Sequence, residues 1–310
     1  MKVLLTGGLG FLGSHLINKL NDHEFFVLDK ETYASHCNPI SGEYRWFKGD
    51  VCNPLAVEEF IGEVDEVWHW AAESFVGSST ELPFTFTHTN IIGTQVILEA
   101  CVKHKKPLVF KSTDEVLGSL PLEDNGERWN DDSPIDPKNI YAATKASAEL
   151  LVRAYMNVHK LPAKIIRCCN VYGPGQHREK FIPKAINAAL NKEPIVLYPD
   201  GKQSREWIYV DDYVRGIETI VSKGEWGETY NLSTGDCWQN QRMVQVILNL
   251  VNDQANTFDY WHFRGSVAFK DERPGHDERY HMESFKVEDL GWEQAVSMEK
   301  GLKETINWYA

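Results

Sequence analysis

The sequence predicts an α/β protein in which a Rossmann-like, doubly wound parallel sheet is joined to a smaller α/β lobe. The first half alternates short apolar runs with amphipathic helical segments, a pattern typical of βαβ units. A glycine-rich turn follows the first apolar run. After residue 170, Gly173-Pro174-Gly175 and scattered prolines divide the chain into shorter elements. We therefore expect a first domain over residues 1–170, to which 206–235 returns, and a discontinuous lobe over 171–310.

The expected strands and helices alternate along the first half. Strands are predicted where short apolar runs occur, at Val3–Leu5, Phe25–Leu28, Glu66–Trp70, Pro107–Lys111 and Ala163–Cys168. Helices are predicted where apolar residues recur every three or four positions, over Phe11–Leu20, Pro54–Ile61, Asn90–His104 and Tyr141–Val158. Two later runs, Ile208–Val210 and Thr229–Leu232, are expected to be strands that return to the first domain.

Composition excludes several classes of function. The 310 residues carry a formal net charge of −13 and no Lys/Arg run, which argues against nucleic acid as a partner. No apolar run reaches the ~20 residues that span a bilayer, and strand-like sequence begins at Met1, so we expect no membrane association, no signal peptide and a cytoplasmic location. Six cysteines without a C-x-x-C pair, and eleven histidines without H-E-x-x-H spacing, predict free thiols and no metal site.

The glycine-rich turn has the sequence context of a dinucleotide site. Gly7, Gly10 and Gly13 lie between the first predicted strand and the first predicted helix. Glycines remove side chains where the turn is tight, where the backbone approaches a pyrophosphate and where the helix meets the strand. The helix N-terminus, which begins at Phe11 and Leu12, is then free to hold the anion.

An acidic residue ends the second predicted strand. Asp29 lies 22 residues after Gly7, where a carboxylate can bind the adenosine ribose hydroxyls and repel a 2′-phosphate. NAD is therefore favoured over NADP, although Lys30 weakens the preference. Asp50-Val51, shortly before the helix predicted at Pro54–Ile61, is either an adenine contact or a helix cap.

The most informative segments are K-S-T-D-E-V, beginning at Lys111, and Y-A-A-T-K, beginning at Tyr141. A Lys four residues after a Tyr lies on the same helix face, so Lys145 can lower the pKa of the phenol and make it a usable base for hydride transfer. The adjacent carboxyls of Asp114 and Glu115 supply a second acid and base at a neighbouring carbon. The pattern predicts oxidation combined with elimination, with a solvated turn and a surface helical pair as the alternatives.

Taken together, these motifs resemble the extended short-chain dehydrogenase/reductase family and, within it, the nucleoside-diphosphate-glucose 4,6-dehydratases of the dTDP-glucose type. The resemblance runs nearly end to end. Its motifs are T-G-G-L-G-F-L-G at Thr6, D-K-E-T-Y-A at Asp29, H-W-A-A-E-S at His69, S-T-D-E-V at Ser112, Y-A-A-T-K at Tyr141, N-V-Y-G-P at Asn170, E-K-F-I-P at Glu179, R-E-W-I-Y-V-D-D at Arg205 and R-P-G-H-D-E-R-Y at Arg273. Related epimerases generally lack the Asp-Glu pair, so that pair decides the subclass.

The resemblance implies a role for each matching position. The residues implied to be catalytic are Thr113, Asp114, Glu115, Tyr141 and Lys145. NAD would be bound by Gly7, Gly10, Phe11, Leu12, Gly13, Asp29, Lys30, Asp50, Val51, Ala71, Ala72, Tyr141 and Lys145. The nucleoside-diphosphate sugar would be bound by Ser74, Asn170, Glu179, Lys180, Arg205, Asn240 and Arg273. Within this set, arginine offers the bidentate hydrogen bonding that a phosphate needs.

The implied reaction yields a 4-keto-6-deoxy sugar nucleotide with no net redox change. Tyr141 would take the O4 proton as hydride leaves C4 for NAD, while Lys145 binds the nicotinamide ribose and Thr113 hydrogen-bonds near O4. The C4 ketone acidifies C5, so Glu115 would remove the C5 proton as protonated Asp114 protonates the departing C6 hydroxyl. Hydride would then return to C6, and Glu115 would reprotonate C5.

The resemblance also implies a homodimer built from the helices around 90–104 and 141–158. Ile97, Ala100 and Leu151 would either meet the partner or pack on the chain's own sheet.

Two departures from the family pattern flank the expected substrate pocket. Leu117 stands where Tyr is usual, and Gly77-Ser78 replaces Asp-Arg. Because of these departures, the nucleotide base and the sugar of the substrate are not assigned from the sequence. The alternatives are a 4-epimerase or decarboxylase, a dehydratase that also epimerises C5, and a non-catalytic NAD-sensing module.

Overall fold

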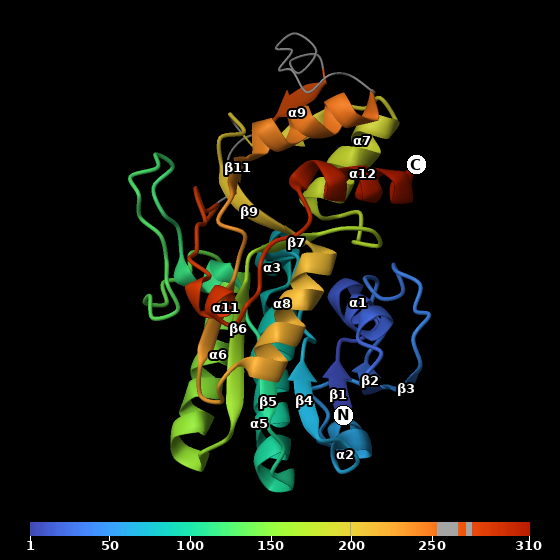
Figure 1. Ribbon diagram of the computed structural model, residues 1–310, viewed down its shortest axis with the longest axis vertical. Coiled ribbons are helices and arrows are strands. Elements are labelled where there is room, and N and C mark those ends of the chain that lie inside the picture. The colour runs from blue at the N-terminus through green and yellow to red at the C-terminus, as the bar shows by residue number, and fades with distance from the viewer. Residues whose placement is uncertain (199, 253–265, 271–274) are drawn as a thin grey trace.

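The computed structural model describes residues 1–198, 200–252, 266–270 and 275–310, and its first domain is built on a seven-stranded parallel sheet (Figure 1). Along the sheet the strands are β10 (Thr229–Leu232), β6 (Ala163–Cys168), β5 (Leu108–Lys111), β4 (Glu66–His69), β1 (Lys2–Thr6), β2 (Glu24–Asp29) and β3 (Tyr44–Lys48). The order reverses at the neighbours β1 and β4. Ligands bind beside the carboxyl ends of strands at such a switch point.

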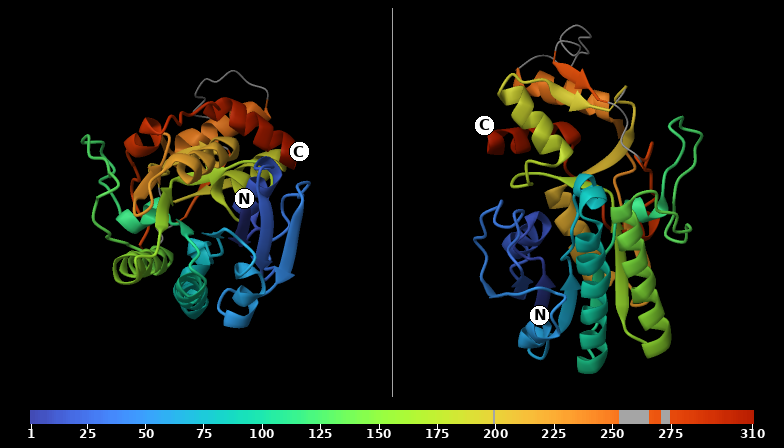
Figure 2. Two further views of the ribbon diagram at one scale, coloured as in Figure 1. Left: turned by 60° about the horizontal axis from the view of Figure 1, so that its bottom comes forward. Right: turned by 180° about the vertical axis from the view of Figure 1, so that it is seen from behind.

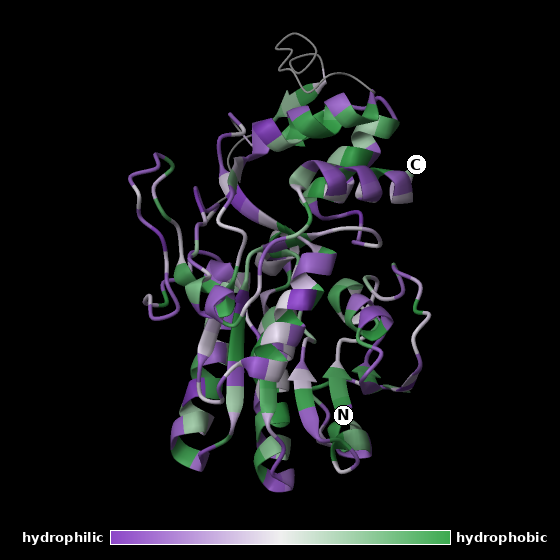
Figure 3. Cartoon of the chain, viewed as in Figure 1, coloured by the Kyte–Doolittle hydropathy of each residue, from purple (hydrophilic) through white to green (hydrophobic). Residues whose placement is uncertain are grey.

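Helices cover both faces of this sheet. The helices α2 (Pro54–Ile61), α5 (Gly93–His104) and α6 (Ile140–His159) lie on one face, and α1 (Phe11–Lys19) and α8 (Val210–Lys223) lie on the other (Figure 2). Side chains of β1 alternate between the two resulting cores: Leu4 packs in one, Val3 and Leu5 in the other. Burial on both faces explains the nearly continuous apolar strands, which Figure 3 colours mostly green.

The predicted elements of the first half are present, with small differences at their ends. The helix expected to begin at Asn90 instead starts as a π-helix, η1 (His88–Ile92), that runs into α5. Short elements were not predicted from the sequence: α3 (Val76–Glu81), α4 (Pro83–Thr87) and the 3-10 helix η2 (Asp114–Leu117).

The smaller lobe lies above the carboxyl ends of the sheet in Figure 1. It contains a three-stranded sheet of β7 (Asn170–Tyr172), β9 (Ser204–Tyr209) and β11 (Cys237–Gln239), and a two-stranded sheet of β8 (Ile195–Leu197) and β12 (Val267–Phe269). Its helices are α7 (Phe181–Leu190), α9 (Asn240–Val251) and α12 (Met298–Tyr309), whereas α11 (Phe285–Asp289) contacts β10 and α8 of the first domain.

The two segments expected to return to the first sheet differ in outcome. Thr229–Leu232 forms β10 and pairs with β6 in parallel. Ile208–Val210 was wrong as a returning strand, because β9 ends at Tyr209 in the separate three-stranded sheet and Val210 begins α8. An apolar run that crosses a strand-to-helix boundary gives no periodic signal of where the change occurs.

All six cysteines are free thiols. Within the described ranges, no helix is long and apolar enough to cross a membrane, and no group of His, Cys, Asp or Glu is arranged to hold a metal.

Candidate active site

The glycine-rich turn brings the N-terminus of α1 to the wall of a cavity at the switch point. Gly7 has a φ of 70°, and a Cβ there would lie 2.8 Å from the backbone of Ala71. A Cβ on Gly13 would lie 2.5 Å from the Cα of Gly8. Because position 13 is Gly, α1 can approach the turn this closely. Gly10 caps α1 without a side-chain bond, which leaves the first helical N–H groups available to an anion.

The buried carboxylate of Asp29 ties this turn to the loop after β2. Its Oδ2 accepts from the Leu9 N–H at 3.0 Å. Its Oδ1 accepts from the Glu31 N–H at 2.8 Å and from the Ser35 hydroxyl at 3.2 Å. The carboxylate is thereby fixed at the end of β2, where the sequence predicts a ribose contact.

Lys30 does not present a free positive charge beside Asp29. Its Nζ lies 2.9 Å from Glu73 Oε1 and donates to Thr89 Oγ1 at 3.1 Å. Because Glu73 offsets the Lys30 charge, Lys30 offers little attraction to a 2′-phosphate. Asp50 lies 4.0 Å from Lys30 Nζ and accepts from the Cys52 N–H at 2.9 Å, as a turn-capping carboxylate does.

The two adjacent carboxyls have different surroundings. Asp114 is 2% exposed, and burial followed by the negative charge of Glu115 raises its pKa to about 7. Asp114 Oδ1 accepts from the Thr113 hydroxyl and from the Glu115 N–H, each at 3.0 Å. Its Oδ2 has no hydrogen-bond partner among the described residues. Asp114 can therefore hold a proton near neutral pH, whereas Glu115 is half-buried and accepts from the Asn139 amide at 2.9 Å.

Tyr141 and Lys145 are both buried on α6, next to the carboxyl pair. Burial and then the charge of Glu115 raise the pKa of Tyr141, while a hydrogen bond with Thr113 acts in the opposite direction. Burial and then the charge of Lys111 lower the pKa of Lys145 to about 7. The Lys145 ammonium donates to the Lys111 carbonyl at 2.8 Å. The pKa of Tyr141 is thus raised, opposite to the lowering by Lys145 that the sequence predicted.

One cavity gathers most of the sequence-predicted site residues. It is lined by Gly7, Gly10, Phe11, Leu12, Gly13, Asp29, Lys30, Val51, Ala71, Ala72, Ser74, Thr113, Asp114, Glu115, Tyr141, Lys145, Asn170, Glu179 and Lys180. Asp50, Arg205 and Asn240 do not line it. Arg273 lies outside the described residues.

The segment before α7 closes one side of this cavity. Lys180 donates to the carbonyl of Ser74 at 2.7 Å and to its hydroxyl at 3.3 Å, and burial lowers the pKa of Lys180 to about 8. Glu179 accepts from the Tyr33 hydroxyl at 3.0 Å, which joins this segment to the loop after β2. The Asn170 amide nitrogen has no hydrogen-bond partner among the described residues, so it is an available donor in the cavity wall.

Arg205 and Asn240 were predicted to bind the substrate, and the structure places them differently. The guanidinium of Arg205 donates to the carbonyl of Asp277 at 2.7 Å and lies 4.2 Å from the ring centre of Tyr280. Asn240 begins α9, where its N–H donates to Gln203. Arg205 therefore fixes the segment around 277–280 instead of lining the cavity, a function that depends on a contact between residues far apart in the sequence.

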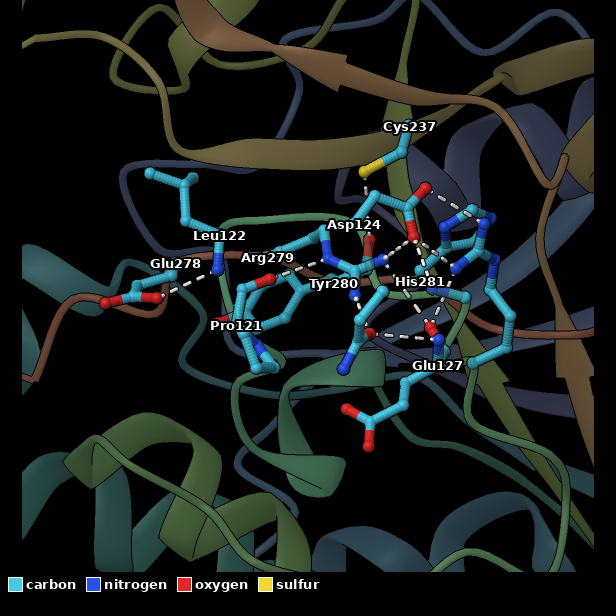
Figure 4. A network of polar contacts seen from close by, with 12 residues as sticks. Pro121, Leu122, Asp124, Glu127, Cys237, Glu278, Arg279, Tyr280 and His281 are labelled. Atoms are coloured by element: carbon cyan, nitrogen blue, oxygen red, sulfur yellow. Dashed lines mark hydrogen bonds and ion pairs between the residues drawn. The ribbon is translucent and has the colours of Figure 1, made fainter.

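A second buried arginine anchors the long loop that precedes α6. Arg279, 2% exposed, donates from Nε to the carbonyl of Pro121 at 2.8 Å and lies 3.2 Å from Asp124 (Figure 4). The Leu120 and Trp129 N–H groups bond to carbonyls of the 279–281 segment. The loop between Glu115 and Tyr141 is thus held against the C-terminal segment.

Two polar networks beneath the site carry residues that sequence reasoning missed. His69 Nδ1 lies 2.7 Å from the Thr6 hydroxyl, which accepts from the Ala71 N–H at 3.1 Å. Ser112 donates at 2.8 Å to buried Glu149, which pairs with buried Arg167 at 2.7 Å. Glu149 is four residues after Lys145, and this continuation of the Tyr/Lys spacing was a sequence signal that could have identified it.

The two departures from the family pattern lie in different elements, Leu117 in η2 and Gly77-Ser78 in α3. Leu117 is 3% exposed and packs in the main core, so it does not line the cavity. Gly77 and Ser78 lie in α3, close after Ser74 in the chain.

The sequence and the structure were compared with known proteins. Residues 3–233 match the profile of the NAD dependent epimerase/dehydratase family. The chain is 36% identical over 318 residues to the low-salt glycan biosynthesis protein Agl12 of Haloferax volcanii, covering 100% of this chain and 98% of that protein. It is 37% identical over 319 residues to dTDP-glucose 4,6-dehydratase of Mycolicibacterium smegmatis, covering 100% and 93%.

A solved structure gives the same picture. The crystal structure of DesIV, a dTDP-glucose 4,6-dehydratase from Streptomyces venezuelae with NAD and a nucleotide bound, superposes with a TM-score of 0.90 at 36% identity. The match covers 100% of this chain and 97% of that one. The similarity therefore includes the cavity and both lobes.

Proposed function

The chain belongs to the NAD dependent epimerase/dehydratase family, and on this basis we propose that it is an NAD-dependent nucleotide-sugar 4,6-dehydratase, a hydro-lyase. Its substrate is a nucleoside-diphosphate hexose, dTDP-glucose or a UDP-sugar, and its product the 4-keto-6-deoxy derivative. The single observation that carries the proposal is the pair Asp114 and Glu115 beside Tyr141 and Lys145 in one cavity, with the Asp114 pKa raised to about 7. Hydride transfer alone needs no such carboxyl pair.

The first domain fits NAD by its own geometry. The turn lies close to Ala71 and to α1 because Gly7 and Gly13 carry no Cβ, and the uncapped start of α1 lines the cavity. Asp29, which accepts from the Leu9 N–H at the end of β2, is the residue that we propose for the adenosine ribose hydroxyls, and Lys30 is paired with Glu73. We assign NAD binding to residues 1–170 with 206–235, and substrate binding to 171–310.

We expect NAD to bind much more tightly than NADP. A 2′-phosphate would meet the buried Asp29 carboxylate, and the adjacent cation, Lys30, is already paired with Glu73. Titration calorimetry with both cofactors measures the ratio of affinities, and equal or tighter binding of NADP would refute this assignment.

Bound NAD would supply the acceptor for the hydride of sugar C4 and the source of the hydride for C6. Tyr141 takes the O4 proton, and Thr113, which hydrogen-bonds Tyr141, orients that oxygen. The positive charge of Lys145, four residues away on α6, stabilises the Tyr141 phenolate, which is the form that takes this proton. Burial of both groups excludes water that would compete for the proton.

Elimination is assigned to the carboxyl pair. Glu115 removes the C5 proton made acidic by the C4 ketone, and Asp114 protonates the C6 hydroxyl as it leaves. A raised Asp114 pKa keeps that proton available near neutral pH, and Asp114 Oδ2 has no hydrogen-bond partner among the described residues. Ser74, Asn170, Glu179 and Lys180 remain the proposed substrate contacts in the cavity, while Arg205 and Asn240 need a rearrangement to join them.

Product analysis tests the proposal. Purified protein is incubated with a panel of nucleotide sugars, and the products are examined by mass spectrometry and for the alkali-induced absorbance of a 4-keto sugar. Loss of one water supports dehydration. An unchanged mass with an altered sugar configuration would identify a 4-epimerase, and loss of carbon dioxide from a uronic acid a decarboxylase.

We also propose a homodimer formed by α5 and α6. Ile97 and Ala100, expected as possible partner contacts, instead pack in the chain's own core, and Leu151 is half-buried against it. The candidates that remain form one row on α6 at intervals of three and four residues, as in helix pairs: exposed Ala143, Leu150, Ala154 and Val158, and half-buried Ser147. We place the enzyme in the cytoplasm, where thiols such as its six free cysteines stay reduced.

A further inference from the structure

Asn139 lies between the two catalytic segments and bonds to both. It is the N-cap of α6, two residues before Tyr141. Its backbone has φ −133° and ψ 166°, and its side-chain Oδ1 accepts from the Ala142 N–H at 2.9 Å. Its amide nitrogen donates to Glu115 Oε2 at 2.9 Å. One side chain thus joins the start of the helix that carries Tyr141 and Lys145 to the carboxylate assigned to C5.

The same amide nitrogen reaches a third segment. It lies 3.3 Å from Asp277 Oδ2, which also accepts from the Tyr280 hydroxyl. This approach depends on Gly275, whose φ is 68° and where a Cβ would lie 2.7 Å from the carbonyl of Lys138. Asn139 is therefore placed where α6, the 3-10 helix of Glu115 and the C-terminal segment meet.

The amide is suited to these contacts by its chemistry. An N-cap needs an acceptor, and Asn, Asp and Ser supply one about equally well. Bonding to a carboxylate needs a donor, which Asn has and ionised Asp lacks. Asn provides an acceptor for the helix and two N–H donors for the carboxylates at once. The cap alone does not explain this choice of residue.

We propose that Asn139 is a positioning residue of the elimination step, holding the Glu115 carboxylate in fixed register with Tyr141 through the N-cap of α6. The proposal rests on the proposed function, because it concerns the base that removes the C5 proton. Since α6 carries Tyr141 and Lys145, the bond couples the site of hydride removal to the site of proton removal at the adjacent carbon. A displacement of a catalytic group by on the order of 1 Å lowers the rate about 10²-fold, so the position of the Glu115 carboxylate relative to Tyr141 affects turnover.

The titratable groups that face Glu115 come from four directions. Asp114 is adjacent in the chain, Tyr141 lies on α6, Lys180 precedes α7, and Tyr280 lies on the C-terminal segment. Asp277 adds a carboxylate on the far side of Asn139. The Asn139 amide is therefore a donor between the two carboxylates of Glu115 and Asp277. Replacement of Asn139 by Asp would add a third negative charge there.

The test compares Asn139→Asp and Asn139→Ser with a matched control, Asn53→Asp. Asn53 is the exposed N-cap of α2, accepting from the Leu55 N–H at 3.0 Å, so the control makes the same chemical change at another cap. Each protein is assayed with a nucleotide sugar that the wild type dehydrates. The readouts are the pH profile of kcat, reduced-nicotinamide absorbance in a single turnover, and deuterium entry at C5 in D₂O.

In Asn139→Asp the added negative charge should shift the acid limb of the kcat profile to higher pH by about one unit, because a like charge disfavours ionised Glu115. Turnover near neutral pH should fall on the order of 10-fold to 10²-fold, with reduced nicotinamide accumulating and C5 deuteration slowed. In Asn139→Ser turnover should fall without the upward shift, since no charge is added. Unfolding temperatures should stay close to that of the wild type, and Asn53→Asp should match the wild type throughout.

A wild-type pH profile and C5 exchange rate in Asn139→Asp would overturn the proposal. So would an equal fall of Asn139→Ser and Asn139→Asp that follows a lowered unfolding temperature, since that result would assign only a cap. If Asn139→Asp does not fold, the Asn139→Ser exchange rate decides alone. Failure of the proposed function is distinguishable, because the wild type would then release no dehydrated product from any sugar in the panel.

Discussion

At the scale of single residues, Asp114 and Glu115 are neighbours in sequence with unlike surroundings. Asp114 is 2% exposed and its pKa is raised to about 7, whereas Glu115 is half-buried and accepts from an amide. The sequence shows that the two carboxyl groups are adjacent. Their assignment as acid and base came from the family resemblance. Burial raises the pKa of Asp114, and burial is a property of the three-dimensional structure.

Glu115→Gln should separate oxidation from elimination. The isostere keeps the shape and removes the base, so bound NAD should still be reduced while dehydrated product falls on the order of 10²–10⁴-fold. Tyr141→Phe should instead suppress the reduced-nicotinamide signal. Stopped-flow absorbance and product mass measure the two steps, and normal turnover by Glu115→Gln would remove the elimination assignment.

Asp114→Asn should stabilise the fold at high pH and not at low pH. The pKa of Asp114 is raised from 3.8 to about 7, so the folded state favours the protonated carboxyl. Its stabilising effect is fully present below pH 3.8 and is lost as pH rises through about 7. The neutral amide does not lose a proton, so the difference in unfolding temperature should grow from about pH 4 to about pH 8. Calorimetry without substrate measures it, and a difference that does not vary with pH would contradict the raised pKa.

At the scale of elements, α6 organises the site through residues at intervals of four. Tyr141 and Lys145 face the cavity, and Glu149 pairs with Arg167 of β6 at 2.7 Å while accepting from Ser112. Arg167 also donates to the carbonyl of Asp131 at 3.1 Å. The helix, the strand and the catalytic segment are thereby joined at one buried ion pair.

Glu149→Gln should lower the free energy of unfolding by about 3–5 kcal/mol, because it leaves the Arg167 guanidinium buried without its carboxylate. Glu299→Gln is the matched control: Glu299 pairs with Lys303 at 2.7 Å on the exposed surface of α12, and its loss should cost under about 1 kcal/mol. Denaturant unfolding gives both values. Equal effects would show that the buried pair is not special.

The elements that sequence predicted well are those with a clear period. Strands β1, β2, β5 and β6 and helices α1, α2 and α6 have bounds close to the expected ones because their apolar patterns are regular and bounded. The π-helix before α5 and the end of β9 at Tyr209 have no such pattern. Arg205 was assigned to phosphate by resemblance, but its donation to Asp277 depends on residues 72 positions apart, a contact that no local pattern encodes.

At the scale of the whole molecule, the surface row on α6 predicts assembly. Leu150 and Val158 are 54% and 73% exposed, a large apolar area for two residues of one helix. Leu150→Glu with Val158→Lys should therefore convert a dimer to a monomer in light scattering at micromolar concentration. Leu55→Glu on α2, where Leu55 is 80% exposed, should not. A monomeric wild type would refute the interface.

The place of β10 also sets the order in which the chain can fold during synthesis. β6 ends at Cys168 and meets its outer neighbour only when Thr229–Leu232 has emerged from the ribosome. Until then β6 is an open strand edge made of buried residues, the kind of edge that pairs wrongly with other chains. The first domain cannot be completed before residues 171–205 of the second lobe have been made. A nascent chain that stops before residue 229 should therefore be a substrate for chaperones or proteases and not a stable NAD-binding fragment.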